Sequence, residues 1–290
     1  MQPVKGEKFM EMQNTVAGSA AVSGISLHTG ARATLRIQPA EVNSGIVFRR
    51  VDIPGVNEVR ALASNVVDVR RGTTIASGQA VVATVEHIMS ALHACKIDNA
   101  VIEMNGMEPP IADGSAAPYV EMIREAGIVQ QDAPARIFTP DRVLFVDGGT
   151  TKIYLAPADK LEIACTTSFE GCPFDPQFFE LDVTPESYSE VAAARTFVQF
   201  NDLKQLLAMG LVKGGSLDAA AILYNGAIIC KEDLRWTNEI VRHKIMDLIG
   251  DLYLCGCRVH GKVTAVKPGH PKNVEMAGML LKCMMEQQGK

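Results

Sequence analysis

One segment, NEIVRHKIMDLIGDLYLCG at residues 238–256, constrains the fold of this chain more than any other. Its spacing predicts a helix with two opposed stripes. His243, Asp247 and Asp251 follow one another at intervals of four, so their side chains stack along one face. The opposite stripe is apolar and consists of Val241, Ile245, Leu248 and Leu252. Both faces are therefore expected to be buried or half-buried, which places this helix between other layers of the structure.

The order of the elements indicates that this helix belongs to the second of two similar units. In each half, strand-like segments come first, and a helix then leads into an apolar strand. The corresponding segments are EHIMSALHACKIDNAVIEM at 86–104 and HKIMDLIGDLYLCG at 243–256, followed by KVTAV at 262–266. A chain of 290 residues has room for two domains. We predict an α+β protein with two similar α/β-sandwich domains, 1–130 and 131–290, whose helix layers pack together between outer sheets. The polar segment 129–140 is the candidate linker.

Composition and charge narrow the class of protein. Hydrophobic residues make up 47% of the chain and charged residues 21%, which is enough to bury a sizeable core. The net charge is −5, whereas a nucleic-acid-binding protein usually presents a basic face, so we expect no nucleic-acid partner. The seven cysteines include no C-x-x-C pair and are expected to be reduced thiols. No apolar run approaches the about 18 residues of a membrane span. We therefore predict a cytoplasmic protein without stable membrane insertion, and we further expect a monomer.

The polar stripe of the 238–256 helix has two interpretations. Imidazole and carboxylate are both zinc ligands, and His243 with Asp247 would supply two of them from one rigid element. Alternatively, Asp247 pairs with Lys244, and His243 forms an ordinary hydrogen bond in the core. The residues of this helix alone leave both interpretations open.

The matching helix of the first half offers a third ligand. Catalytic zinc takes three protein ligands and keeps an open position for water. If the halves pack helix to helix, His87 can complete a His/His/Asp active site at the domain interface, with the adjacent Glu86 as general base. Hydrolysis also requires an acid for the leaving group. His270, in the loop sequence KPGH, is a candidate, and Asp251 could orient it.

Seven short motifs together resemble a known family. They are TVEHIMSAL, IDNAVIEM, PIADGSAAPYV, AARTF, GGSLDAA, VRHKIMDLIGDLYLCG and PGH. In their order and spacing they are similar to the UDP-3-O-acyl-N-acetylglucosamine deacetylases, the zinc amidases of lipid A biosynthesis. The resemblance runs from SGISLHTG to near the C-terminus. It implies two α/β-sandwich halves with the active site between them. It also implies one catalytic Zn²⁺ per chain and an acylated UDP-sugar substrate, UDP-3-O-(3-hydroxyacyl)-N-acetylglucosamine, whose N-acetyl group is released as acetate.

The resemblance further implies roles for the matching residues at the metal. His87, His243 and Asp247 match the zinc ligands of the family, and Glu86 matches its general base. These are the same residues that the two helices offer on chemical grounds.

Other matches concern the substrate. His270 matches a histidine that stabilises the oxyanion and protonates the leaving amine, Asp251 its orienting partner, and Thr196 a threonine that hydrogen-bonds the oxyanion. An inserted segment at about 197–225 would form a hydrophobic passage for the acyl chain. The residues implied to contact substrate are Lys244, Phe197, Leu203, Val212, Gly215, Ser216 and Ala220.

Two regions depart from the family pattern. TSFEGCPFDPQFF at 167–179 replaces a commoner Asp-His-Pro-like stretch, and VVDVRRGTTIASGQ at 66–79 shares little with the family. Both are expected near the edge of the substrate site. The preferred acyl length therefore stays open. Two other functions are weighed: a related zinc hydrolase acting on another amide, and a metal-stabilised binding protein without turnover, which would hold its metal with four protein ligands.

Overall fold

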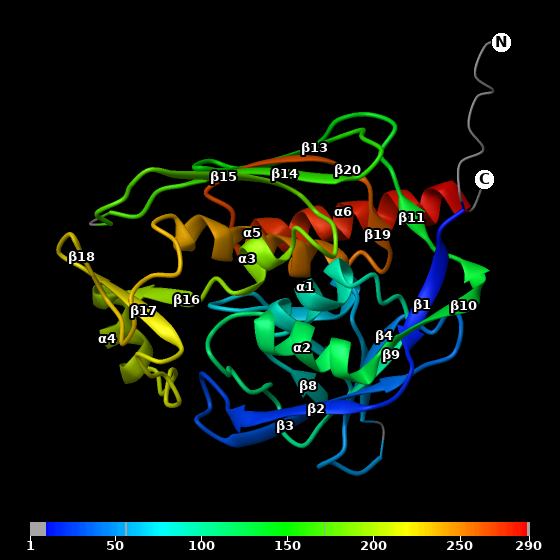
Figure 1. Ribbon diagram of the computed structural model, residues 1–290, viewed down its shortest axis with the longest axis horizontal. Helices are drawn as coiled ribbons and strands as arrows, with labels where there is room; N and C mark the ends of the chain where they lie inside the picture. Colours follow the sequence, from blue (N-terminus) through cyan, green and yellow to red (C-terminus); the bar gives the residue numbers. More distant parts are fainter. Residues whose placement is uncertain (1–9, 56, 171, 289–290) are drawn as a thin grey trace.

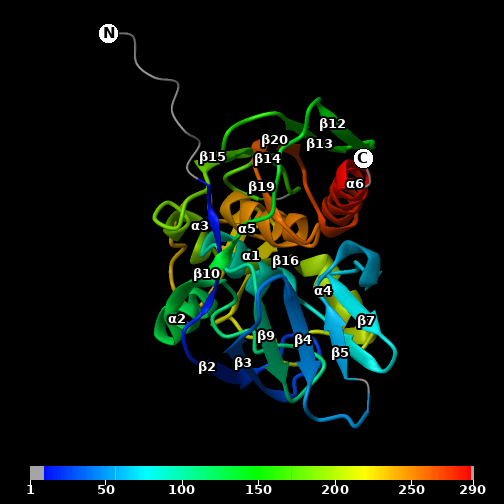
Figure 2. The same cartoon turned by 90° about the vertical axis from the view of Figure 1, so that its right-hand side faces the viewer.

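The computed structural model describes residues 10–55, 57–170 and 172–288, and each half contains a five-stranded sheet (Figure 1). In spatial order, the first sheet consists of β2 (Ala20–Ile25), β3 (Arg32–Pro39), β9 (Ala100–Met104), β4 (Ile46–Arg50) and β5 (Glu58–Arg60). The second consists of β12 (Leu144–Gly148), β13 (Thr151–Ala156), β20 (Gly261–Val266), β14 (Leu161–Thr167) and β15 (Gln177–Asp182). The two sheets form opposite outer layers of the molecule (Figures 1 and 2).

The two sheets share one topology. In both, the first two strands pair antiparallel, and the second pairs antiparallel with the last strand in sequence. That last strand pairs parallel with the third strand, which pairs antiparallel with the fourth. The repeated order supports the duplicated unit expected from the sequence, and the predicted α+β class is confirmed.

Alternating burial explains why the helices cover only one face of each sheet. In β14, Leu161, Ile163 and Cys165 are buried, and the residues between them are half-buried. The strand β9 alternates in the same way. Because successive side chains of a strand point to opposite faces, the apolar set of each strand faces the helices.

The helices lie between the sheets, as predicted (Figures 1 and 2). They are α1 (Glu86–Ala94) and α2 (Ala117–Ala126) in the first half, and α3 (Ser189–Ala192), α5 (Glu239–Tyr253) and α6 (His270–Gln288) in the second. In α5 every residue except Lys244 is buried, so both of its stripes face protein. All nine residues of α1 are buried as well. None of the helices in the described part of the chain has the length and apolar character needed to cross a membrane.

Smaller elements complete the two halves. The first contains the short helix Ala63–Asn65 and a three-stranded sheet of β6 (Val66–Asp68), β7 (Thr74–Ser77) and β8 (Ala80–Val82). The second contains β16 (Thr196–Gln199), α4 (Phe200–Ala208), β17 (Ala220–Tyr224) and β18 (Ala227–Ile229), which project to the left in Figure 1. The segment 197–225, predicted as an insertion, falls within this last unit.

The predicted linker at 129–140 is instead largely strand. Residues Ile128–Pro134 form β10, which pairs antiparallel with β1 (Met12–Val16). Ile137–Phe138 form β11, which pairs parallel with β19 (Arg258–Val259). The predicted boundary between residues 130 and 131 therefore cuts through β10. Most of the side chains of β10 are exposed, so it lacks the alternation that identifies a half-buried strand in a sequence.

The two halves meet at a close approach of α1 and α5. A Cβ atom added to Gly250 of α5 would lie 2.0 Å from the backbone carbonyl oxygen of Glu86 in α1. Only glycine allows this backbone approach. It brings the first turn of α1, with Glu86 and His87, next to the polar stripe of α5.

We expect Gly250→Ala to lower the free energy of unfolding by roughly 1–3 kcal/mol, because the added methyl group must push the helices apart. Gly278→Ala is the matched control, since Gly278 lies in α6 and an added Cβ there meets nothing within 4 Å. In the control, alanine should be neutral or stabilising, because it favours a helix over glycine by about 1 kcal/mol. Chemical denaturation measures both variants. Equal stability of the two would show that the α1–α5 contact is not tight.

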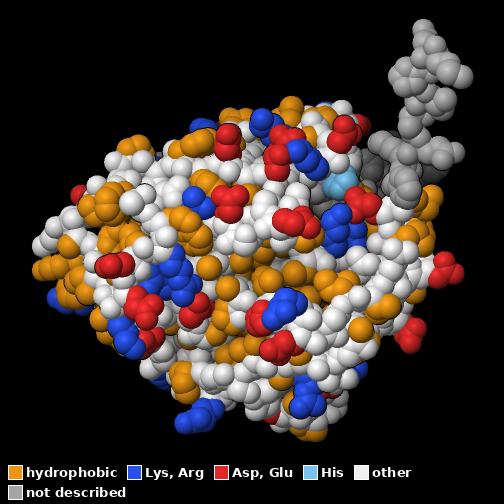
Figure 3. All heavy atoms as spheres, viewed as in Figure 1, with side chains coloured by type: hydrophobic (Ala, Val, Ile, Leu, Met, Phe, Trp, Pro, Cys, Tyr) orange, Lys and Arg blue, Asp and Glu red, His pale blue; other side chains and the backbone are white. Residues whose placement is uncertain are grey.

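Both charge signs are interspersed on one face of the molecule (Figure 3). On the face drawn in Figure 3, Lys and Arg side chains lie among Asp and Glu side chains, with hydrophobic groups between them.

Candidate active site

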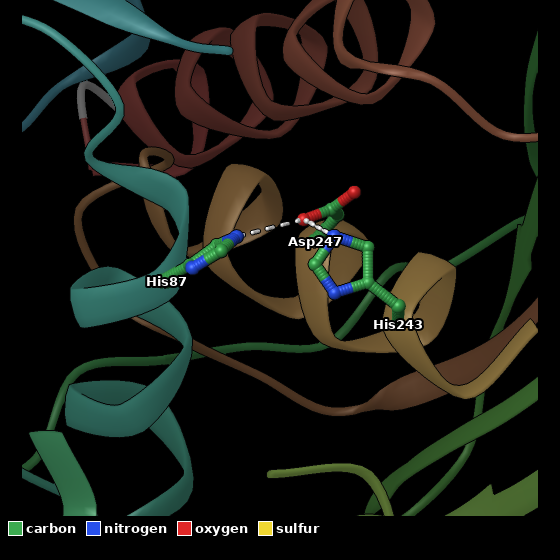
Figure 4. Close-up of side chains that lie close together, drawn as sticks. All are labelled: His87, His243 and Asp247. Atoms are coloured by element: carbon green, nitrogen blue, oxygen red, sulfur yellow. Dashed lines mark ion pairs between the residues drawn. The ribbon is translucent and has the colours of Figure 1, made fainter. Parts of the chain in front are cut away.

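His87, His243 and Asp247 converge at the interface of the two halves (Figure 4). His87 projects from the first turn of α1, and the other two lie one turn apart on α5. Asp247 Oδ1 is 3.7 Å from His87 Nε2 and 3.4 Å from His243 Nε2. The three potential ligand atoms all lie within 4.8 Å of one another.

The surroundings put these groups in the protonation states that a metal requires. Burial lowers the pKa of His87 to about 3 and also lowers the pKa of His243, so both imidazoles are neutral. Burial alone would raise the pKa of Asp247, but His243 and Lys244 outweigh it and lower this pKa, so the carboxylate is ionised. His243 Nδ1 lies 3.0 Å from the Ala194 carbonyl oxygen, to which it can donate. In that tautomer Nε2 carries the lone pair that a metal would take.

The donor set fits a divalent cation. Asp247 Oδ1 is buried and has no hydrogen-bond partner among the described residues. Its other oxygen, Oδ2, accepts a hydrogen bond from Lys244 Nζ at 2.8 Å. The ordinary pairing weighed from the sequence is therefore present, but it satisfies only one carboxylate oxygen. Two neutral imidazoles and one carboxylate oxygen remain, which is a set of ligands typical of catalytic zinc.

Glu86 lies beside His87 in the same pocket. Its side chain is 3% exposed, and burial raises the pKa of its carboxyl group to about 7. Glu86 Oε2 accepts a hydrogen bond from the Thr73 N–H at 2.9 Å. A carboxyl group with a pKa near neutrality can both accept and return a proton.

His270 forms a pair with Asp251. His270 Nδ1 is 2.8 Å from Asp251 Oδ2, and its Nε2 is 4.0 Å from Asp247 Oδ2. Burial alone would lower the pKa of His270, but the Asp251 carboxylate outweighs this effect and raises the pKa to about 9. The imidazole is thus a cation at neutral pH. The sequence predicts a loop at His270, whereas it is the first residue of α6.

A pocket of about 420 Å³ opens over these groups. Its polar wall includes Glu86, His87, Thr196, His243, Lys244, Asp247 and His270. Leu27, Val69, Ile111, Phe169, Phe197 and Pro271 supply apolar surface, and Arg70 and Arg71 also line it. The pocket therefore combines a group of residues that could hold a metal ion with apolar and cationic surfaces.

A buried ion pair holds Thr196 at the pocket wall. The carboxylate of Glu239, in the first turn of α5, accepts hydrogen bonds from the Arg195 N–H, Nε and Nη2 at 2.9, 2.9 and 3.1 Å. The Thr196 N–H donates to the Gly114 carbonyl oxygen at 2.8 Å. Gly114 has φ +82°, and a Cβ there would lie 1.6 Å from the carbonyl oxygen of Ala219, which directly precedes β17. Position 114 therefore requires glycine.

The structure brings together some of the predicted substrate residues and not others. Thr196, Phe197 and Lys244 line the pocket, and Lys244 Nζ lies 5.3 Å from the centre of the Phe197 ring. Five predicted residues belong to the β16–β18 unit and do not line this pocket: Leu203, Val212, Gly215, Ser216 and Ala220. Leu203, Val212 and Ala220 are half-buried there.

The sequence placed residues 66–79 near the edge of the substrate site, but no role was predicted for any single residue of 69–73. Val69, Arg70 and Arg71 line the pocket, and Thr73 hydrogen-bonds to both Glu86 and Asp251. These residues lie in a segment without helical or strand periodicity. The signals in the sequence were the departure of 66–79 from the family pattern and the run of two cations before Gly72.

The chain is similar to proteins of one named family. The sequence model of the family "UDP-3-O-acyl N-acetylglycosamine deacetylase" matches residues 13–282. Three similar proteins carry the name UDP-3-O-acyl-N-acetylglucosamine deacetylase. The one from Geobacter sp. (strain M21) is 41% identical over 94% of this chain and 90% of its own length. The one from Anaeromyxobacter sp. (strain Fw109-5) is 42% identical over 93% of this chain and 88% of its own length. The one from Chlamydia pneumoniae is 38% identical over 94% of this chain and 98% of its own length. This chain belongs to the UDP-3-O-acyl N-acetylglycosamine deacetylase family.

Proposed function

We propose that this chain is a zinc-dependent deacetylase of lipid A biosynthesis. It hydrolyses the N-acetyl group of a UDP-3-O-(3-hydroxyacyl)-N-acetylglucosamine and releases acetate. The observation that carries the proposal is the convergence of a His/His/Asp set, a buried carboxyl group and a cationic histidine in one pocket. The family match supports the substrate class.

His87, His243 and Asp247 would hold one Zn²⁺. A zinc ion in such a site acts as a Lewis acid that activates water and polarises the amide carbonyl. The unpartnered Asp247 Oδ1 and the neutral state of both histidines support zinc over the ordinary core interpretation.

Glu86 would act as the general base. It accepts a proton from the attacking water while the water oxygen bonds to the amide carbon. Burial supports this role, because it keeps the carboxyl group poised near neutrality.

His270 would act as the acid, with Asp251 holding its ring. As a cation it stabilises the negative charge on the carbonyl oxygen, and it donates its proton to the sugar nitrogen when the C–N bond breaks. Thr196, at the same wall, would hydrogen-bond the developing oxyanion. Lys244 and Phe197 would contact the sugar nucleotide.

The β16–β18 unit would form the acyl passage, with Leu203, Val212 and Ala220 as walls and Gly215 and Ser216 nearby. Its position supports this role. Gly214 N–H donates to the Leu27 carbonyl oxygen at 3.0 Å, and Leu27 lines the pocket.

We further propose two units divided near β10, a cytoplasmic location and a monomeric state.

An alternative is a related zinc amidase that acts on another amide. Deacetylation of UDP-sugars with and without the 3-O-acyl chain separates the two. We expect the acylated substrate to have a far higher kcat/KM, because each buried CH₂ contributes about 0.8 kcal/mol. Equal kcat/KM for both substrates would remove the passage from the mechanism. If neither substrate releases acetate, the proposed function is contradicted.

We expect kcat/KM to be bell-shaped in pH. Activity should rise as Glu86 ionises and fall as His270 loses its proton, because the base must be charged while the acid is protonated. A bound divalent cation would lower both pKa values. Replacing Asp251 with asparagine should move the basic limb to lower pH, since the carboxylate raises the pKa of His270. A basic limb that stays in place in both Asp251→Asn and His270→Ala would belong to another group.

A further inference from the structure

Thr73 lies directly before β7, and its polar groups contact both Glu86 and Asp251. Its side chain is fully buried. Its N–H donates to Glu86 Oε2 at 2.9 Å, and its hydroxyl donates to Asp251 Oδ1 at 2.6 Å. The same hydroxyl oxygen is 3.5 Å from His270 Nδ1. One residue therefore touches the proposed base and the carboxylate that holds the proposed acid.

The backbone of Thr73 also fixes the entry to α1. The Thr73 carbonyl oxygen accepts a hydrogen bond from the Val85 N–H at 3.1 Å. Val85 immediately precedes the helix whose first residues are Glu86 and His87. Together with the bond to Glu86 Oε2, this contact places the Glu86 side chain relative to the loop before β7.

The hydroxyl of Thr73 fixes the plane of the Asp251 carboxylate. Asp251 Oδ2 is shared by His270 Nδ1 at 2.8 Å and Asn273 Nδ2 at 2.9 Å. Asp251 Oδ1 accepts its hydrogen bond, among the described residues, from the Thr73 hydroxyl. Asp251 is completely buried, so removal of this donor leaves a charged oxygen unpaired. The carboxylate is then free to turn toward its remaining donors, and the His270 ring turns with it.

We propose that Thr73 is a positioning residue that aligns Glu86 with the Asp251–His270 pair, an inference that rests on the proposed deacetylase function. One proton passes from the attacking water to Glu86, and the other passes from His270 to the sugar nitrogen. Base and acid must therefore keep a fixed separation. Thr73 connects them through two different groups, the backbone to Glu86 and the hydroxyl to Asp251. A side-chain substitution therefore breaks only the second connection.

Steady-state kinetics of Thr73→Val and Thr73→Ser test the role of the hydroxyl. Valine has the same shape without the hydroxyl, and serine keeps the hydroxyl. We expect Thr73→Val to lower kcat roughly 10–100-fold, as is usual for partners that orient catalytic groups, with KM changed less than about two-fold. Thr73→Ser should retain most of the wild-type kcat. Thr74→Val is the matched control, because Thr74 is the next residue and undergoes the same chemical change. It should leave kcat unchanged.

Two kinetic outcomes would overturn the proposal. One is a Thr73→Val variant with wild-type kcat, and the other is a Thr73→Ser variant as slow as Thr73→Val, which would make packing rather than the hydroxyl responsible. If Thr73→Val does not fold, Thr73→Ala and Thr73→Ser form a second pair that differs by one hydroxyl group. Equal kcat in that pair would also overturn the proposal.

Nitrogen NMR of the zinc-free protein with ¹⁵N-labelled histidine provides a readout that does not depend on activity. At one fixed pH, the Nδ1 resonance of His270 should shift in Thr73→Val and return in Thr73→Ser, because its Asp251 partner is released and restored. An unchanged resonance in Thr73→Val would overturn the proposal. Should the wild-type enzyme not deacetylate the UDP-sugar, the proposed function fails, and the resonance still decides whether Thr73 orients His270.

Discussion

Replacing Glu86 with glutamine is expected to lower kcat by roughly 10²–10⁴, the usual contribution of a general base. The amide has nearly the shape of the carboxylate and can still accept the hydrogen bond from the Thr73 N–H. It cannot accept the proton of the attacking water. Because Glu86 is not one of the three converging ligands, zinc content should remain near one equivalent.

Thermal unfolding distinguishes this chemical loss from a structural one. Burial raises the pKa of Glu86 in the folded protein, so the ionised carboxylate is disfavoured there. The protonated carboxyl group of Glu86 therefore contributes fully to stability at low pH, and this contribution is lost as pH rises through the folded pKa near 7. Above this pH, Glu86→Gln in the zinc-free state should be at least as stable as the wild type. A variant that loses its zinc would identify Glu86 as a ligand instead of a base.

Much of the architecture follows from patterns that burial imposes on the sequence. A helix with apolar residues on one stripe and His243, Asp247 and Asp251 on the other has no face for solvent, and α5 is indeed enclosed on both sides. The candidate metal ligands could also be predicted from the sequence. Two ligands four residues apart on one helix need a third from a facing element. His87 on α1 lies where this third ligand would be.

Other features depend on contacts that a linear pattern does not encode. The strand β10 exposes most of its side chains, so it reads as a linker, although its backbone pairs with β1, more than a hundred residues earlier. Thr73 acts through its backbone N–H and carbonyl groups and its hydroxyl, and a threonine between Gly72 and Thr74 carries no periodic signal. The requirement for Gly250 appears only when α1 lies against it.

The second large effect concerns the metal. Treatment with a chelator is expected to abolish deacetylation, and about one equivalent of zinc should restore it, because the ligands must be deprotonated and are already so in the folded protein. The double variant His87→Ala/Asp247→Ala should neither bind zinc nor recover activity. Removing one ligand from each helix leaves His243 alone at the site.

A control separates loss of ligands from loss of a buried histidine. His93 lies on the same helix as His87, is 8% exposed, and does not belong to the converging set. His93→Gln should retain about one zinc per chain. Zinc should also raise the melting temperature of the wild type and of His93→Gln, because a ligand at 100 times its Kd stabilises the folded state by about 2.7 kcal/mol. The double variant should show no such rise. If it retains stoichiometric zinc or is stabilised by zinc to the same extent, the metal lies elsewhere, and the His/His/Asp set is an ordinary part of the α1–α5 interface.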